Sequence, residues 1–514
     1  MTNGRTSNQA LPLPAWGIRL ESRKVDSETG AIKKMPPPGE LIVALKQNIG
    51  VPAETIVQPG ERVLKGQPIA IASRWGLSVA VHAPTSGAVM AIEERPIPVA
   101  GGGTGESVII EPDGKEERYA GYVAQMNSKR LPPHQIRNDI MEAGIVGMGG
   151  ALFPTATKLN PGSGIQALIL NGVECEPYIS ADNALLTERS DQVLQGAAIM
   201  LAALDCDECL VAVKADMAEA QAAVQAAIDA LGDDRISLVV VPAFYPAGGE
   251  RQLIELITGK EVQAGGLPWD VGVVCQNVGT AAAVAKFFDE GEPLISRIVT
   301  VTGDGVGTAA NIEVMIGTPI VDLVEFAGGY TDDAAGLVMG GPMMGFSLPH
   351  DQLPVTKATN CILVAGQAEL DPSVREMPCI RCGECARVCP AALMPQQLLA
   401  LARGPDYEAL ESQGLQDCIQ CGCCDYVCPS YIPLTSRFIE AKQGLWENHR
   451  VSQRSALALR RFDARGERLE RRESDRSDEL QRQVDEIGPA GEIDADALRQ
   501  LKQRVKSKKP GDKT

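Results

Sequence analysis

The sequence has no long apolar run, and none of its runs approaches the ~18–20 residues that a membrane-spanning helix needs. Its first residues also lack the apolar core of a signal peptide. We therefore expect a chain with no transmembrane segment of its own, which stays in the cytoplasm unless a partner holds it at a membrane. Basic residues are outnumbered, with 48 Lys and Arg against 66 Asp and Glu. The resulting net charge of −18 argues against nucleic acid as a partner.

The basic residues that are present are unevenly distributed. Residues 446–514 contain 17 Lys and Arg and 14 Asp and Glu, so this tail is slightly basic while the rest of the chain is acidic. Its apolar residues are sparse, which predicts a charged tail that is a solvated helix and partly disordered. At 514 residues the chain is too long for one hydrophobic core, and about three to five domains are expected.

Cysteine is abundant, with 14 residues, and eight of them form a repeated pattern. The pattern C-x2-C-x2-C-x3-C-P occurs twice between residues 379 and 429. It is typical of two-cluster ferredoxins, in which three cysteines of a run hold one [4Fe–4S] cluster and the fourth reaches the other cluster. The pattern predicts one cluster on Cys379, Cys382, Cys385 and Cys428, and a second cluster on Cys418, Cys421, Cys424 and Cys389.

Two structural zinc sites or a disulfide framework are the alternatives for these cysteines. Zinc sites usually pair two C-x2-C units without the C-x3-C-P ending. Disulfides need an oxidising compartment, which nothing in the sequence suggests. Cys423 lies beside Cys424 and could replace it, but only Cys424 keeps the spacing of the first run. The remaining cysteines are expected to be reduced thiols, most of them buried.

The N-terminal part predicts an arm followed by a β domain. Residues 1–39 are polar and rich in proline, as in an extended arm. Residues 40–130 contain short β-type runs, and the stretches 58–68 and 82–89 resemble the halves of a biotinyl/lipoyl-like sandwich-hybrid domain. A carrier domain of that type has a modifiable lysine between two methionines, and no Met-Lys-Met occurs here. We therefore expect a structural domain.

Residues 131–290 predict a Rossmann-like α/β domain. Buried strands at 167–170, 210–213 and 237–241 alternate with helices at 185–203 and 216–231, which is typical of parallel β-α-β units. A glycine-rich loop at 147–158 ends in a lysine, and close backbone amides with a cation suit a phosphate. Polar stretches at 171–178 and 245–250 follow the first and third strands. Ligands of open α/β sheets bind at these carboxyl ends.

The C-terminal half predicts two further domains. Residues 291–360 predict a β-hairpin with a following helix, similar to a soluble-ligand-binding β-grasp module, for which a spacer role is expected. Residues 340–345 lack a lysine and predict a turn. Residues 361–445 predict a helical two-cluster ferredoxin domain, because leucines recur at helical spacing between the cysteine runs. The fold class is therefore multidomain α/β and α+β, with the charged tail at 446–514.

The glycine-rich loop and the polar stretches resemble the flavin and NADH site of the flavoprotein subunit of respiratory complex I. With the sandwich domain and the doubled cysteine run, they resemble the RnfC family of Rnf complexes over about residues 15–445. The resemblance implies noncovalent FMN held by Gly147, Gly149, Gly150, Lys158, Asn171, Glu174, Tyr245, Asn277 and Thr280. It also implies a dinucleotide facing Phe153, Glu176 and Glu250, with Gly248 lining the same cofactor site. Leu152, Cys175 and Tyr178 replace smaller residues and would narrow the crevice.

The resemblance implies an electron-input subunit at the cytoplasmic face of the inner (plasma) membrane. It would pass electrons between NAD(H), FMN and two [4Fe–4S] clusters, as part of a ferredoxin:NAD+ oxidoreductase whose other subunits translocate ions. Its partners would be those subunits, with ferredoxin or flavodoxin served indirectly. A soluble flavin and iron–sulfur reductase resembling the cobalamin reductases is an alternative. Another is a cluster-bearing electron-relay scaffold without turnover.

Overall fold

The computed structural model describes residues 11–24, 27, 30–125, 128–162, 164–369, 375–404, 406–486, 494–496, 498–500 and 503. Within these residues the strands form one sheet of six strands, two of four and one of three. The chain divides into two compact units, residues 1–442 and residues 443–514. All four sheets belong to the first unit.

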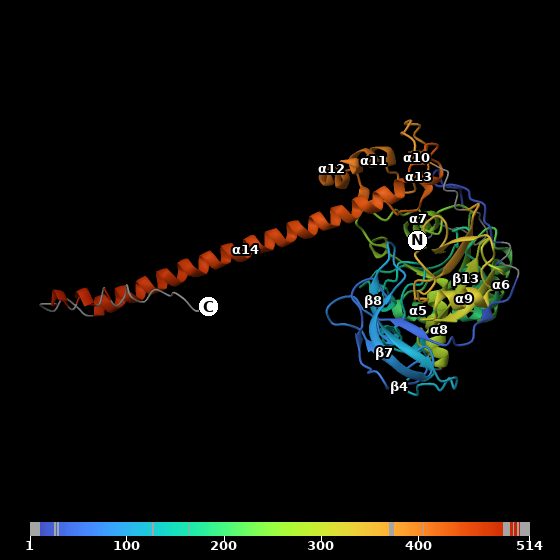
Figure 1. Cartoon of the computed structure of the whole chain (residues 1–514), viewed down its shortest axis with the longest axis horizontal. Helices are drawn as coiled ribbons and strands as arrows, with labels where there is room; N and C mark the ends of the chain where they lie inside the picture. Colours follow the sequence, from blue (N-terminus) through green and yellow to red (C-terminus); the bar gives the residue numbers. More distant parts are fainter. Residues whose placement is uncertain are drawn as a thin grey trace. The chain divides into compact units, whose positions relative to one another are not determined.

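The N-terminal domain is built from two antiparallel sheets (Figure 1). The first has the strand order β2-β8-β7-β4 and the second the order β3-β5-β6. Their bounds are β2 Leu41–Ala44, β3 Glu54–Thr55, β4 Arg62–Val63, β5 Pro68–Ile71, β6 Val81–His82, β7 Gly87–Pro96 and β8 Thr104–Pro112. Leu41, Ile69 and Val108 come from both sheets and pack into one core. The predicted two-sheet sandwich is confirmed.

The second domain has a parallel four-stranded sheet of order β11-β10-β9-β12. The strands are β9 Ala167–Gly172, β10 Cys209–Lys214, β11 Ile236–Val241 and β12 Val273–Asn277. Successive side chains point to opposite faces. Leu168 and Leu170 pack in one core with helices α5 (Ser190–Leu204) and α8 (Val278–Glu290), and Ile169 packs in another with α7 (Glu250–Thr258). Both faces of the sheet are therefore covered, as parallel sheets require.

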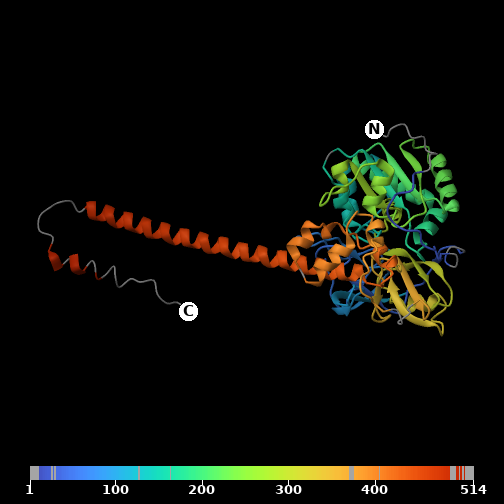
Figure 2. The same ribbon diagram turned by 90° about the horizontal axis from the view of Figure 1, so that it is seen from above.

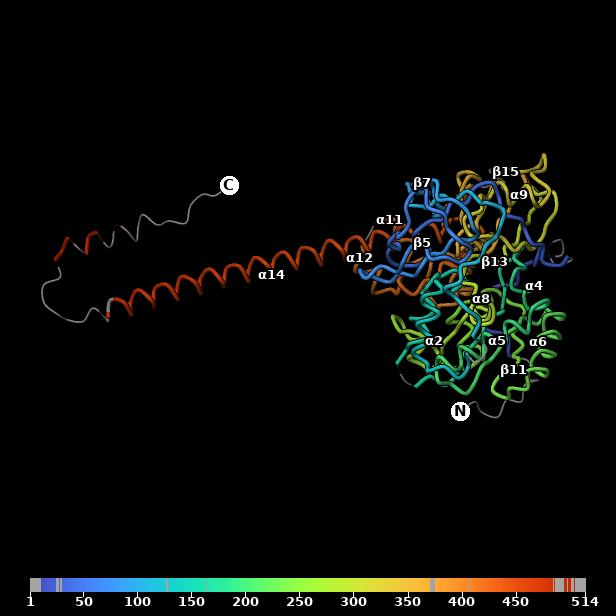
Figure 3. Tube along the Cα trace, turned by 90° about the horizontal axis from the view of Figure 1, so that it is seen from below, coloured from blue at the N-terminus to red at the C-terminus, as the bar shows by residue number. Residues whose placement is uncertain are grey.

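Helices α5 and α8 of this domain lie side by side (Figure 3). The helices of the domain are η1 Ser128–Arg130, α2 Pro133–Glu142, α3 Thr155–Lys158, α4 Ala181–Glu188, α5 Ser190–Leu204, α6 Ala218–Leu231, α7 Glu250–Thr258, η2 Pro268–Val271 and α8 Val278–Glu290. The single helix expected at 185–203 is wrong, because the chain breaks at Arg189 between α4 and α5. The Ser190 hydroxyl bonds the Leu186 carbonyl there, and such side-chain bonds compete with the helix.

The third domain has a six-stranded sheet of order β1-β14-β13-β17-β15-β16. Its elements are β1 Lys33–Lys34, β13 Ser296–Thr302, β14 Ala310–Met315, α9 Ile320–Phe326, β15 Ala334–Met339, β16 Phe346–Leu348 and β17 Cys361–Gly366. The expected hairpin with its following helix is confirmed as β13, β14 and α9. β17 lies beyond the expected boundary at residue 360 and pairs with β13. The arm contributes β1 to this sheet.

The cluster domain is helical around the two cysteine runs, as expected. Its helices are α10 Glu384–Arg387, α11 Pro395–Arg403, α12 Tyr407–Ser412, η3 Leu415–Asp417, α13 Cys423–Tyr426 and the first residues of α14 Leu434–Glu486. Leu398, Leu410 and Phe438 form its core. Figure 2 shows α14 as one continuous helix. Most of the expected tail beyond Glu486 lies outside the described residues. Among the helices of the described residues, none combines the length with the apolar character that crossing a membrane takes.

Candidate functional site

The candidate crevice is the region at the carboxyl ends of β9 and β12, where the strand order of the parallel sheet reverses. The chain proceeds from β9 to β10 on one side, whereas β12 pairs with β9 on the other side. Such a reversal of strand order is where open α/β sheets bind ligands. Asn277 ends β12 and caps α8, since its side-chain oxygen accepts a hydrogen bond from the Gly279 amide at 2.8 Å. The site is therefore positioned by the topology.

The glycine-rich loop lies over the start of α8. The Met148 amide donates to Thr280 Oγ1 at 2.9 Å, and the Gly147 amide donates to the Phe153 carbonyl at 2.8 Å. Gly150 has a φ of +108°, which few other residues adopt, and a Cβ there would meet nothing within 4 Å. Residues 149–151 are exposed, and no hydrogen bond to another described residue engages their amides. The loop thus presents free donors.

The charged pair of the site is Lys158 with Glu250. Lys158 ends α3 and Glu250 begins α7, and their side chains form a short ion pair. Nearby, Asn171 Nδ2 donates to the Gly248 carbonyl at 2.8 Å. A Cβ at Gly248 would lie 2.2 Å from the Val173 carbonyl oxygen, so only glycine fits this turn. The structure therefore brings the residues after β9 and β11 together with the end of the glycine-rich loop.

The Glu174 carboxylate lies at the start of α4, and its cofactor-binding role stays a prediction. The carboxylate accepts hydrogen bonds from the Asp182 amide at 2.9 Å and the Asn183 amide at 3.3 Å, at the start of α4. Lys24 of the arm lies 3.7 Å from the same carboxylate. An acidic group at a helix start satisfies unpaired amides. The Glu174 side chain is thus committed to α4 and to the arm, and it is 8% exposed.

Glu176 is bonded to the third domain, and its role facing a dinucleotide stays a prediction. Its Oε1 accepts hydrogen bonds from the Met343 amide at 2.7 Å and the Met344 amide at 2.9 Å. These residues belong to the expected turn at 340–345, which is confirmed. Burial raises the pKa of Glu176, and the two amides oppose that rise. Two amide donors favour a buried carboxylate, so the side chain turns toward the third domain.

Tyr245 and Gln252 connect the second domain to the cluster domain. The Tyr245 hydroxyl donates to the Cys421 carbonyl at 2.6 Å, and Gln252 Nε2 donates to the Pro390 carbonyl at 3.4 Å. Tyr245 is 2% exposed. The Cys421 carbonyl lies inside the second cysteine run. The crevice and this run are therefore in direct contact through one buried side chain.

Asp182 was missed by the sequence interpretation, since it sits in the first turn of α4 as an ordinary helix residue. Its Oδ2 accepts a hydrogen bond from Asn277 Nδ2 at 2.7 Å. Burial raises the pKa of Asp182 to about 7, and the neighbouring Glu174 carboxylate adds to the rise. Its partners come from other segments, so no local pattern could reveal it.

Replacing Asp182 with asparagine is expected to change how stability depends on pH. Because the folded pKa lies above the ordinary value of 3.8, Asp182 contributes stability that is present below about pH 4 and lost as pH rises toward 7. The variant lacks this titrating group. The free energy of unfolding of the wild type should therefore fall relative to that of Asp182→Asn by up to ~1.4 kcal/mol per pH unit in that window. Urea unfolding at pH 5.5 and pH 7.5 measures the difference. A difference that is constant with pH would contradict the expectation.

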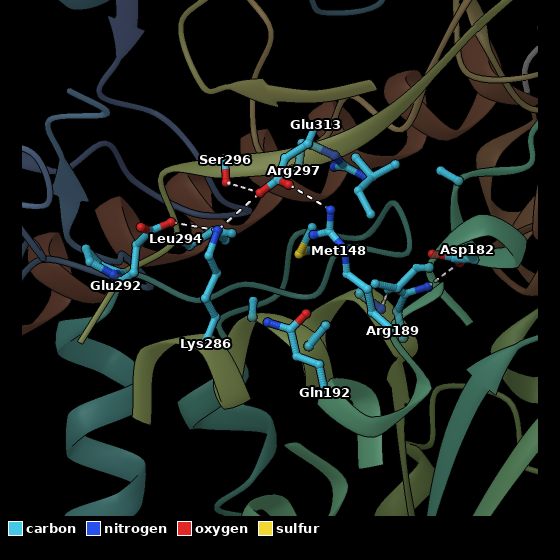
Figure 4. A pocket seen from close by; sticks show the side chains of 18 residues that line it. Met148, Asp182, Arg189, Gln192, Lys286, Glu292, Leu294, Ser296, Arg297 and Glu313 are labelled. Atoms are coloured by element: carbon cyan, nitrogen blue, oxygen red, sulfur yellow. Dashed lines mark hydrogen bonds and ion pairs between the residues drawn. The ribbon is translucent and has the colours of Figure 1, made fainter. Parts of the chain in front are cut away.

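A charged cavity lies beside the start of α8 (Figure 4). Lys286 is 2.6 Å from Glu292 and 3.1 Å from Glu313, and Arg189 is 2.9 Å from Glu313. Burial lowers the pKa of Arg297, at its far wall, to about 10. The pairs with Glu313 join Arg189, between α4 and α5, and Lys286 of α8 to β14. These ion pairs connect the second and third domains.

The first cysteine run lines one cavity together with the last cysteine of the second run. The cysteines are Cys379, Cys382, Cys385 and Cys428. Apolar residues Leu399, Ile432 and Leu434 line the same cavity. Cys379 and Cys382 are exposed, whereas Cys385 and Cys428 are partly buried. Both cysteine runs thus contribute thiols to one space.

The second run gathers around the last cysteine of the first run. Burial raises the pKa of Cys389, and the neighbouring Cys421 adds to the rise. Burial also raises the pKa of Cys418, and Cys421 and Cys389 add to it. Cys423 is buried, and the neighbouring Cys421 thiol raises its pKa. This arrangement supports the crossed cluster assignment, which stays a prediction, as does the choice of Cys424 over Cys423. No group of three or more His, Cys, Asp or Glu among the described residues is arranged for a single metal ion.

The crevice suits a phosphate-bearing flavin by its donors. The exposed amides of residues 149–151 are free, and Lys158 lies at the end of the same segment. Free backbone amides with a cation nearby are the donors that a phosphate needs, so the residues present fit the group.

Comparison with known families matches four domain types in the expected order. Residues 15–115 match the RnfC barrel sandwich hybrid domain, and residues 140–286 match the Nuo51 FMN-binding domain. Residues 298–347 match the SLBB domain, and residues 378–432 match the 4Fe-4S dicluster domain. These matches confirm the predicted multidomain fold at this level, while the exact boundaries stay predictions.

Similar proteins are the RnfC components of ion-translocating oxidoreductase complexes. The one from Pseudomonas aeruginosa is 45% identical over 90% of this chain and 59% of its own length. The one from Yersinia pestis bv. Antiqua is 42% identical over 88% of this chain and 73% of its own length. The chain thus spans from about three fifths to about three quarters of these relatives. An NAD+-reducing [NiFe]-hydrogenase structure is 19% identical over 58% of this chain and 61% of that chain, with a TM-score of 0.45, too low to support an argument.

Proposed function

Because the chain belongs to the RnfC family of ion-translocating oxidoreductase complexes, we propose that it is the electron-input subunit of such a complex. In this role it exchanges electrons with NAD(H) and passes them to two [4Fe–4S] clusters. FMN, when bound, would exchange a hydride with the nicotinamide and deliver electrons singly, as a one-electron cluster needs. The protein contributes binding, orientation and an insulated route between cofactors.

The observation that carries this proposal is the hydrogen bond from Tyr245 to the Cys421 carbonyl at 2.6 Å. It joins the loop after β11, at the mouth of the crevice, to the second cysteine run. Val388 and Cys423 pack against Tyr245 in the same apolar group. Electron transfer needs the flavin and a cluster to lie close together, and this contact places the second cysteine run next to the loop after β11. The cluster of Cys389, Cys418, Cys421 and Cys424 would therefore receive electrons first.

The residues of the crevice take distinct parts in this proposal. The exposed amides of the glycine-rich loop and Lys158 hold the FMN phosphate, with Asn171 and the start of α8 beside it. Thr280 fixes that start against the loop, and Asn277 caps it. Phe153 and Glu250 face the dinucleotide. Glu174 and Glu176 act through structure, since each carboxylate binds backbone amides.

The exposed first run suggests where electrons leave. Cys379 and Cys382 are exposed, and Ile380 between them is 67% exposed. Another protein of the complex could approach this cluster closely. We place the chain at the cytoplasmic face of the inner membrane, held by the other subunits of the complex, with ferredoxin or flavodoxin served through them.

An anaerobic spectrum of the purified chain tests the proposal. With FMN and both clusters present, NADH should bleach the flavin band and also the broad cluster absorption, because both cofactors lie on one route. Dithionite then gives the total reducible absorbance for comparison. Absence of flavin after incubation with FMN, together with clusters that stay oxidised in NADH, would refute the enzyme role and leave the scaffold.

Co-expression with candidate membrane subunits tests the location. We expect the chain to remain with polytopic subunits through detergent extraction and affinity purification on a tag carried by one of them. Recovery of the whole pool in the soluble fraction, with NADH activity intact, would favour the soluble reductase instead.

A further inference from the structure

The tip of the hairpin between β5 and β6 exposes an aromatic ring. Trp75 is 76% exposed, the highest fraction among the large apolar side chains of the described residues. The Arg74 guanidinium lies over the ring, 4.8 Å from its centroid. Ile49 and Leu77 beside it are 55% and 40% exposed. Grouped exposed apolar side chains of this kind often mark a binding surface.

This tip is fixed by hydrogen bonds. The Trp75 amide donates to Ser73 Oγ at 3.3 Å, and that hydroxyl donates to Glu54 Oε1 at 2.7 Å. The Leu77 carbonyl accepts from the Val51 amide at 2.9 Å and from Asn48 Nδ2 at 3.1 Å. The ring is therefore held on a braced loop, which lowers the entropy lost when a ligand binds.

The braced tip is joined to the glycine-rich loop. The Ile49 amide donates to the Leu152 carbonyl at 3.2 Å, and Leu152 immediately precedes Phe153. Trp75 is two residues from Leu77, a span of at most ~7 Å. One segment, 48–51, thus bonds the tip at Leu77 and the glycine-rich loop at Leu152. The tip that carries Trp75 is in this way linked to the residue before Phe153, although it comes from another domain.

We propose that Trp75 stacks on the adenine ring of the nicotinamide dinucleotide. This inference rests on the proposed function. A dinucleotide carries its two bases at opposite ends of a diphosphate, so an adenine lies away from the flavin when the nicotinamide lies against it. Arg74 covers one face of the indole, which leaves the other face for a base. Stacking on an exposed aromatic ring is a common way to bind a base, and an arginine over the ring adds to it.

The test compares NADH with reduced nicotinamide mononucleotide, which lacks the adenosine half. Full-length chain loaded with FMN is assayed anaerobically with ferricyanide as electron acceptor. In Trp75→Ala, KM for NADH should rise about tenfold with kcat unchanged, and KM for the mononucleotide should not change. Trp75→Phe should keep KM for NADH within about threefold, because phenylalanine still stacks.

Trp446 provides a matched control. It is 64% exposed, and Arg450 lies 5.4 Å from its ring centroid, but it belongs to the other compact unit. Trp446→Ala should leave both KM values unchanged. An equal rise in KM for both substrates in Trp75→Ala, or an unchanged KM for NADH, would overturn the inference. Either result would leave the proposed function in place. A wild-type chain that does not oxidise NADH at all would refute both.

Protein fluorescence supplies a measurement that is independent of turnover. NAD+ should quench the emission of the wild-type chain by stacking on Trp75. The quenching should be lost in Trp75→Phe and kept in Trp446→Phe. Quenching that survives in Trp75→Phe would contradict the stacking, whatever the kinetics show.

Discussion

Cys379→Ser combined with Cys428→Ser is expected to leave about four of the eight irons of the chain in place. The two cysteines line the same cavity, so both substitutions damage one cluster only. If each run held its own cluster, the same double variant would lose both clusters and nearly all iron. Iron content per chain, with the cluster signal in low-temperature electron paramagnetic resonance, distinguishes these results.

Two further double variants test the same assignment from the side of the second cluster. Cys389→Ser with Cys424→Ser should again leave about four irons, whereas Cys424→Ser with Cys428→Ser should leave almost none. Cys423→Ser serves as the control for a buried thiol beside the second run, and both clusters should survive it. Loss of the second cluster in Cys423→Ser alone, with retention in Cys424→Ser, would move the ligand assignment by one residue.

Sequence patterns predicted those features whose causes are local. The cysteine spacing is a local requirement of the cluster, and buried strands such as β9 are marked by uninterrupted apolar residues. The parallel sheet then follows from the alternation of strands and helices. These parts of the fold needed no knowledge of distant contacts.

The parts that were missed depend on residues far apart in the chain. Arg189 breaks the expected helix and pairs with Glu313, which is 124 residues away. Glu176 turns toward the amides of Met343 and Met344 because a second domain places those donors beside it. A resemblance transfers residue positions, but it does not transfer the partners that orient each side chain.

The arm illustrates the same limit. It was expected as an extended lead-in, yet β1 pairs with β14 and the Ile18 amide donates to the Tyr245 carbonyl at 2.9 Å. The Gly17 amide donates to the Val388 carbonyl at 2.8 Å. Polar, proline-rich composition could not show which segments the arm contacts, because its partners lie in three other domains.

Lys158→Ala is expected to abolish FMN retention during gel filtration. Lys158 is the cation at the end of the glycine-rich loop, and its side chain is 20% exposed. A hydrogen bond to a charged group contributes about 1.5–3 kcal/mol, so FMN should bind about 10- to 100-fold more weakly. The loss also leaves Glu250 without its partner, which adds repulsion toward a phosphate. Bound flavin per chain and a fluorescence titration measure the effect.

Three variants separate the charge of Lys158 from its other effects. Lys158→Arg keeps the charge and should retain most of the FMN. Lys260→Ala removes one positive charge from the exposed surface of the same domain and should retain all of it. Glu250→Gln frees Lys158 from its ion pair, so FMN binding should hold or tighten while NADH reduction slows. Stoichiometric flavin in Lys158→Ala would show that the loop amides suffice, and the phosphate would then depend on backbone donors rather than on a countercharge.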